Sequence, residues 1–160
     1  MGTYSLLADA LQYPAAGHLE SLQTGLMELP AGEVKRALSE FVQRMQALSL
    51  AEREELHTRT LDLTPIVAPY VGFQIWGKNY QRGKFMAELN RALEASGIDP
   101  EGELPDHLIP VLRYLDTSSD PLPELMEAGK PAVRAMRNAL QKSEPDNPYG
   151  HLLSAILQAL

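Results

Sequence analysis

Apolar residues recur every three or four positions through most of the chain, which is the period of one face of an α-helix. The clearest stripe runs from Gly32 to Leu48 and predicts one amphipathic helix. Shorter stripes predict further helices over residues 4–13, 19–29, 51–63 and 79–96. The chain shows no convincing alternation typical of a β-strand and no internal repeat. The pattern predicts an all-α single domain over residues 1–160, a helical bundle of about eight helices with short connections.

Prolines mark the expected starts of the remaining elements, because proline at the first helical position loses no hydrogen bond. Such starts are expected for a helix or turn at Thr64-Pro65 and for helices at Pro105, Pro131 and Asn147-Pro148. Pro110 lies inside the helix that Pro105 would open. The carbonyl of Asp106 should then lose its usual donor four residues on, and a kink is expected there.

Composition narrows the class of protein. Of the 160 residues, 44% are hydrophobic and 22% are charged, which is typical of globular domains. The absence of cysteine excludes disulfides, thiol catalysis and iron-sulfur ligation. The longest apolar runs, residues 66–71 and 152–157, are far shorter than the roughly 20 residues of a membrane span. Residues 1–13 contain no lysine or arginine, unlike a secretory signal, so we expect a cytoplasmic protein.

The acidic residues are concentrated in one part of the chain. The net charge is −7, and residues 99–127 carry eight carboxylates against Arg113 alone. An acidic stretch repels phosphate backbones and attracts cations, so a basic peptide is a better partner than nucleic acid. A plain solvated surface is the alternative interpretation of this charge.

The sequence predicts no catalytic residue, metal site or cofactor. Histidines are widely separated and have no metal-ligand spacing, and no nucleophile elbow or phosphate-binding loop is present. Asp106 and His107 are neighbours, but adjacent side chains on a helix diverge by about 100° and do not form a dyad. We expect Asp106 to be a first-turn acidic residue and His107 a partly exposed helical histidine.

Four aromatic residues lie within eleven positions and are spaced three, three and four apart: Tyr70, Phe73, Trp76 and Tyr80. On a helix they would form a single stripe. The stripe is either part of the core or the wall of a groove that receives an apolar peptide face. The nearby basic residues Lys78, Arg82 and Lys84 favour at least one exposed edge.

Several blocks of sequence resemble those of one protein family. Residues 103–108, ELPDHL, resemble the E-x-P-D-H motif of the TorD/DmsD/NarJ family of molybdoenzyme assembly chaperones. Residues 58–64, TRTLDLT, resemble the T-F-D-L-T block of the NarJ type, with Leu61 where phenylalanine is usual. The opening YSLLADALQYP is also similar to that group. The order and spacing agree over residues 56–115.

The resemblance implies a helical cytoplasmic chaperone that is not an enzyme. Such a protein binds the N-terminal leader of a molybdoenzyme catalytic subunit, the nitrate reductase alpha subunit in the NarJ case. It holds that subunit until the molybdenum cofactor is inserted, with cofactor-delivery proteins as further partners and no membrane insertion. The family motif falls on Glu103, Pro105, Asp106 and His107, and the peptide groove is expected around the four aromatic residues and Arg82.

Three alternatives remain open at this point. The client could be another oxidoreductase of the DMSO reductase family, or the chain could be a helical interaction scaffold without a peptide client. A small hydrolase or metal enzyme around His107 would predict turnover or bound metal in the purified protein.

Overall fold

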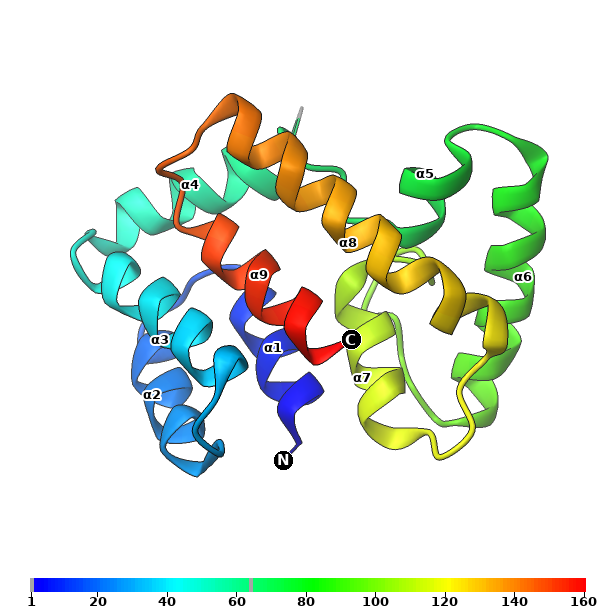
Figure 1. The fold of residues 1–160 in the computed structure, drawn as a ribbon, viewed down its shortest axis with the longest axis horizontal. Coiled ribbons are helices and arrows are strands. Elements are labelled where there is room, and N and C mark those ends of the chain that lie inside the picture. The colour runs from blue at the N-terminus through cyan, green and yellow to red at the C-terminus, as the bar shows by residue number, and fades with distance from the viewer. Residues whose placement is uncertain (1, 64) are drawn as a thin grey trace.

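The computed structural model describes residues 2–63 and 65–160, and these residues form nine α-helices (Figure 1). The predicted all-α class and the bundle of about eight helices are confirmed. The helices are α1 (Thr3–Leu11), α2 (His18–Glu28), α3 (Glu33–Gln46), α4 (Leu50–Leu61), α5 (Val71–Trp76), α6 (Tyr80–Ala95), α7 (Leu108–Thr117), α8 (Pro123–Ser143) and α9 (Tyr149–Ala159).

One apolar core joins these helices. α9 packs between α3 and α8, while α1 packs against α7 and α9. α5 contacts both α6 and α8, so α8 links the two sides of the molecule, as Figure 1 shows. The buried cluster contains residues from every helix, from Leu6 in α1 to Leu157 in α9. The apolar stripes seen in the sequence are therefore the faces that meet in this core.

The predicted helix start at Pro131 is wrong. Pro131 lies inside α8, which begins eight residues earlier at Pro123. A proline inside a helix deprives the carbonyl four residues before it of a donor. Here that carbonyl belongs to Glu127, and both Glu127 and Pro131 are exposed. Water can therefore supply the missing hydrogen bond, and the helix continues.

The helix expected to open at Pro105 begins at Leu108 instead, and this removes the reason for a kink. Pro110 is then in the first turn of α7, where its missing N–H has no partner inside the helix. The carbonyl of Asp106 is not left without a donor, because it accepts a hydrogen bond of 2.8 Å from the backbone N–H of Val71.

The helix starts predicted at Pro148 and at Thr64-Pro65 compare differently with the structure. Pro148 is the N-cap of α9, so the predicted start there is confirmed within one residue. The predicted cap at Thr64 lies outside the described residues. No helix begins at Pro65, and the next one starts at Val71.

Among the described residues, none of the helices combines the length and the apolar character needed to cross a bilayer.

Candidate functional site

Asp106 is a buried carboxylate that joins three helices. Its side chain is 0% exposed. One oxygen, Oδ2, accepts hydrogen bonds from the backbone N–H of Gly72 in α5 and from Nε of Arg82 in α6, both at 3.0 Å. The other, Oδ1, accepts from Nη2 of Arg82 at 3.2 Å. Asp106 itself lies two residues before α7. We call Gly72, Arg82 and Asp106 the Asp106 cluster.

The expectation that Asp106 is an acidic residue of a first helical turn is wrong, because Asp106 precedes α7 and its side chain is buried among groups of other helices. A buried charge is tolerated only when it is paired and hydrogen-bonded, and Arg82 meets that need. The Asp106 cluster also explains why residue 72 is a glycine. A Cβ atom on Gly72 would lie 2.8 Å from Oδ2 of Asp106 and 3.1 Å from side-chain atoms of Arg82 and Phe85. Any larger residue at position 72 would therefore force the carboxylate or the start of α5 to move.

His107 is the N-cap of α7 rather than a helical residue. Its Nδ1 accepts a hydrogen bond of 3.0 Å from the backbone N–H of Ile109, so Nε2 carries the proton in the neutral ring. Its side chain is only 12% exposed. Burial lowers the pKa of His107, and the nearby Glu103 carboxylate opposes that shift. His107 and Asp106 turn to different partners, but the predicted reason is wrong, because neither residue lies inside a helix.

Tyr70 lies at the junction between these groups. Residues 70 and 107 form an isolated antiparallel bridge, and their rings meet edge to face with centroids 5.2 Å apart. The guanidinium of Arg82 lies 5.5 Å from the ring centroids of both Tyr70 and Phe73. The Tyr70 hydroxyl donates to Oε2 of Glu103 at 3.4 Å. Burial and the Glu103 charge raise the pKa of Tyr70.

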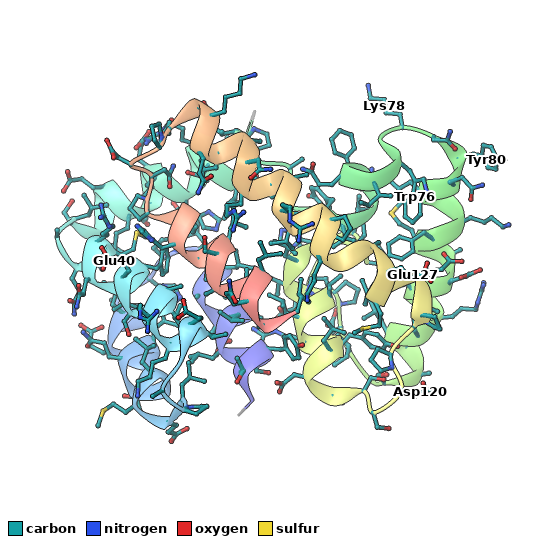
Figure 2. The ribbon with its side chains drawn as sticks, viewed as in Figure 1. Glu40, Trp76, Lys78, Tyr80, Asp120 and Glu127 are labelled. Atoms are coloured by element: carbon teal, nitrogen blue, oxygen red, sulfur yellow. The ribbon has the colours of Figure 1, made fainter. Side chains whose placement is uncertain are left out.

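The prediction of one aromatic stripe is wrong. Tyr70 precedes α5, and that helix ends at Trp76 because Gly77 adopts a positive φ of 60°. Tyr80 belongs to α6 and is 78% exposed. Trp76 packs against the buried Phe85, with ring centroids 5.1 Å apart. Figure 2 shows Trp76 between the two helices and Tyr80 pointing away from them.

The structure therefore divides the predicted site residues into two groups. It brings together Tyr70, Phe73, Arg82, Glu103, Asp106 and His107. Pro105 is half-buried in the turn that leads to this group. Trp76 serves mainly the packing of α5 on α6, while Tyr80 lies apart on the surface.

A pocket of about 320 Å³ opens beside Tyr70, Glu103 and His107. Its remaining wall is built by the end of α1 and the end of α4, and it includes Tyr13, His57 and Asp62. We call this cavity the His107 pocket. The sequence patterns did not predict Tyr13, His57 and Asp62 as site residues. Asp62 does lie in the block 58–64 that resembles the chaperone family, so that resemblance could have indicated Asp62 as a site residue.

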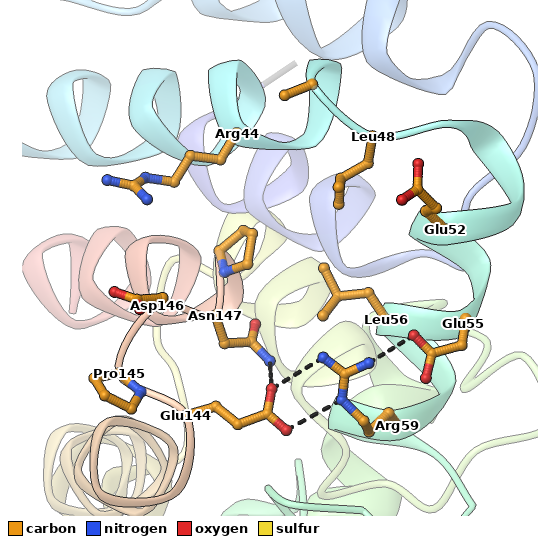
Figure 3. Close-up of a pocket in the computed structure, with 12 residues that line it drawn as sticks. Arg44, Leu48, Glu52, Glu55, Leu56, Arg59, Glu144, Pro145, Asp146 and Asn147 are labelled. Carbon is orange, nitrogen blue, oxygen red and sulfur yellow. Dashed lines mark hydrogen bonds and ion pairs between the residues drawn. The ribbon is translucent and has the colours of Figure 1, made fainter.

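A larger hollow of about 680 Å³ lies between α4 and the turn from α8 to α9 (Figure 3). Arg59 lies in its wall and donates to both oxygens of Glu144, at 3.0 and 3.1 Å, and to Glu55 at 2.6 Å. Asn147 donates to the same Glu144 carboxylate at 3.2 Å and to the hydroxyl of the buried Thr60 at 2.9 Å. We call this cavity the Arg59 hollow. Its central ionic groups are already paired with one another.

Among residues 2–63 and 65–160, no three histidine or carboxylate side chains gather in a way that could hold a metal ion. Compared with models of known protein families, the chain matches none, and no curated protein matches it significantly.

Proposed function

We propose that this protein is a cytoplasmic assembly chaperone that binds the N-terminal leader of a molybdoenzyme catalytic subunit. The nitrate reductase alpha subunit is the preferred client. The chaperone would keep that subunit competent for insertion of its molybdenum cofactor, would bind no cofactor itself, and would catalyse no reaction.

The observation that carries the proposal is the convergence of the residues singled out by the family resemblance. Glu103, Asp106 and His107 come from one short loop, yet they meet Tyr70 and Arg82 from other elements. Asp106 acts through its neighbours, because it is buried and fixes the loop against α5 and α6. Glu103, at 42% side-chain exposure, remains accessible to a partner.

The same contacts favour binding over catalysis at this site. Both carboxylate oxygens of Asp106 are engaged by Arg82 and Gly72, so Asp106 does not orient the imidazole of His107 as a catalytic base would require. His107 uses Nδ1 to cap α7. Asp106 and His107 therefore fix the loop against α5, α6 and α7, and a fixed loop of this kind suits the binding of a partner.

A leader segment would bind through apolar and ionic contacts together. Phe73, Ile75 and Tyr80 offer partly or largely exposed apolar surface on α5 and α6. The acidic segment 99–127 would orient a basic leader and accelerate its association. Because a free leader must become ordered on binding, we expect a dissociation constant on the order of micromolar to tens of nanomolar.

The test is a calorimetric titration of the protein with a peptide that copies the N-terminal leader of a nitrate reductase catalytic subunit. We expect saturable binding that weakens at high salt. Tyr80→Ala should weaken it without changing the stability of the fold, since Tyr80 is 78% exposed. Trp76→Ala is less informative, because the loss of its contact with Phe85 should also destabilise the fold.

A scrambled peptide of equal composition is the control for nonspecific charge attraction. Met27→Ala is the matched protein control, because Met27 is 81% exposed and lies on α2. If the soluble leader peptide does not bind, or binds no better than the scrambled one, nitrate reductase is rejected as the client. A panel of leaders from other oxidoreductases of the DMSO reductase family then separates a different client from a scaffold without one.

A further inference from the structure

The lining of the His107 pocket carries a distinct pattern of charge. Its charged lining groups at neutral pH are the carboxylates of Asp62 and Glu103, and none of the described residues that line it is a lysine or arginine. Asp62 forms no ion pair with any described residue. The guanidinium of Arg82 lies over the Tyr70 ring, but Asp106 holds it. The pocket is therefore negatively charged and has no cation of its own.

The two imidazoles in the wall do not supply positive charge either. Nε2 of His57 lies 2.9 Å from the carbonyl oxygen of Leu11 and donates to it, which leaves Nδ1 as the unprotonated nitrogen of the neutral ring. That Nδ1 is buried and has no hydrogen-bond partner among the described residues. Protonation there would create a buried N–H without an acceptor, which is costly. In agreement, burial lowers the pKa of His57 and of His107.

Aromatic rings complete the wall. Tyr13 meets His57 edge to face, with centroids 5.3 Å apart, and Tyr70 meets His107 in the same way. Tyr13 is 51% exposed although it is large and apolar. Planar aromatic surface beside two carboxylates suits a planar cation, which can stack on the rings and donate several hydrogen bonds at once.

We propose that the His107 pocket binds the guanidinium group of one arginine in the client leader. This inference deepens the chaperone function proposed above and rests on it. The guanidinium would donate to the carboxylates of Glu103 and Asp62 and stack against Tyr13 or Tyr70. A cavity of about 320 Å³ has room for one such side chain. The pocket thereby fixes where along the leader a basic residue must stand.

The test uses arginine amide as the probe and the imidazole proton signals of His57 and His107 as the readout, at pH 7.5. The chain has four histidines, so the signals can be assigned by substitution. We expect arginine amide to shift both signals in a saturable way. Citrulline amide, which has nearly the same shape and no charge, should not shift them. Equal responses to the two compounds, or no response to arginine amide, would overturn the proposal.

Two variants and one matched control show where the probe binds. Glu103→Gln and Asp62→Asn should each weaken arginine amide several-fold, because each removes one acceptor charge from the pocket. Glu20→Gln changes the net charge by the same amount on the exposed side of α2, away from the pocket and from the acidic segment 99–127, and should leave binding unchanged. Lysine amide that binds as tightly as arginine amide would contradict the assignment to a guanidinium.

The leader peptide separates this inference from the chaperone function. Replacing the arginines of the leader by citrulline, one at a time, should weaken binding strongly at one position. If the leader binds and no replacement matters, the pocket assignment fails and the chaperone function stands. If arginine amide binds in the pocket and the leader does not bind, the pocket chemistry stands and the proposed client is wrong.

Discussion

The Arg59 hollow has about twice the volume of the His107 pocket, 680 against 320 Å³. In the larger cavity, Arg59 already satisfies Glu144 and Glu55. In the smaller one, the carboxylates of Asp62 and Glu103 share the wall with aromatic and imidazole rings, and none of the described lining residues is a lysine or arginine. The two cavities therefore differ in whether their charged side chains are already paired, and this matters more than their volumes. The paired charges of the Arg59 hollow stabilise the fold, whereas the carboxylates of the His107 pocket can still bind a charged group.

The two regions also differ in what supports them. The loop beside the His107 pocket is fixed by a buried ion pair between Asp106 and Arg82, with Arg82 18% exposed. The Arg59 hollow is bridged by the Arg59 and Glu144 pair, whose side chains are 41% and 31% exposed. A buried charge that loses its partner is far costlier than a solvated one. Substitutions in the two regions should therefore differ strongly in their effect.

The largest effect is expected for Asp106→Ala. It leaves the guanidinium of Arg82 without its partner in a mostly buried position and also removes the hydrogen bond to Gly72. We expect the free energy of unfolding to fall by about 3–5 kcal/mol, measured by urea denaturation. The double variant Asp106→Ala with Arg82→Met should recover part of this loss, since it removes the unpaired charge. A loss below about 1 kcal/mol would contradict the description of the pair as buried and tightly coupled.

A smaller loss is expected for Gly72→Ala. The added methyl group would lie 2.8 Å from Oδ2 of Asp106, so either the carboxylate or α5 must move. Overpacking of this kind costs about 1–3 kcal/mol. Gly83→Ala is the matched control on α6, because its Cβ would meet open space. That variant should gain about 0.5–1 kcal/mol in thermal denaturation, as glycine is a poor helix former.

Between pH 5.5 and 7.5, the pH dependence of stability should come mainly from the two histidines of the His107 pocket. Burial holds the pKa of His57 and His107 below the ordinary value of 6.5 in the folded state. The unfolded chain therefore binds these protons first as the pH falls, so stability decreases below about pH 6.5 and continues to decrease until the folded-state pKa values are passed. His57→Gln should flatten this decrease in urea denaturation at pH 7.5, 6.5 and 5.5. An unchanged slope would show that His57 is not the buried neutral base described here.

The smallest effect is expected at the Arg59 hollow. Glu144→Gln weakens the pair with Arg59 but keeps a group that can still accept hydrogen bonds from Asn147 and Arg59. Since this pair is solvated, the loss in unfolding free energy should be about 1 kcal/mol or less. A loss as large as that of Asp106→Ala would mean that the two regions do not differ in the way proposed.

Helices with clear apolar stripes could be predicted from the sequence. The stripe over 32–48 contains α3, and the stripe over 79–96 contains α6, because each face packs against the core. Prolines were less reliable as markers of helix starts, because no helix begins at Pro65, Pro105 or Pro131. Pro131 stands inside α8, since exposure of that turn lets water replace a lost hydrogen bond. Sequence rules for proline consider only the hydrogen bonds inside the helix. Whether a helix tolerates an internal proline also depends on whether water can reach the carbonyl that loses its donor.

The candidate site could be predicted only in part. The E-x-P-D-H resemblance drew attention to Glu103, Asp106 and His107, which do meet Tyr70 in space. The sequence favours a first helical turn for Asp106 and does not indicate its burial, because its partner Arg82 stands 24 positions earlier and no periodicity relates the two. Tyr13 and His57 come from other helix ends, and only the packing of α1, α4 and α7 brings them to the same pocket.

Hydrogen-deuterium exchange of the protein with and without the nitrate reductase leader peptide tests the central claim most directly. We expect slower exchange on peptide binding in residues 69–76 and 101–109, around the Asp106 cluster and the His107 pocket. Residues 144–148 at the Arg59 hollow should exchange at an unchanged rate. Protection confined to residues 144–148, or no change anywhere at saturating peptide, would contradict it.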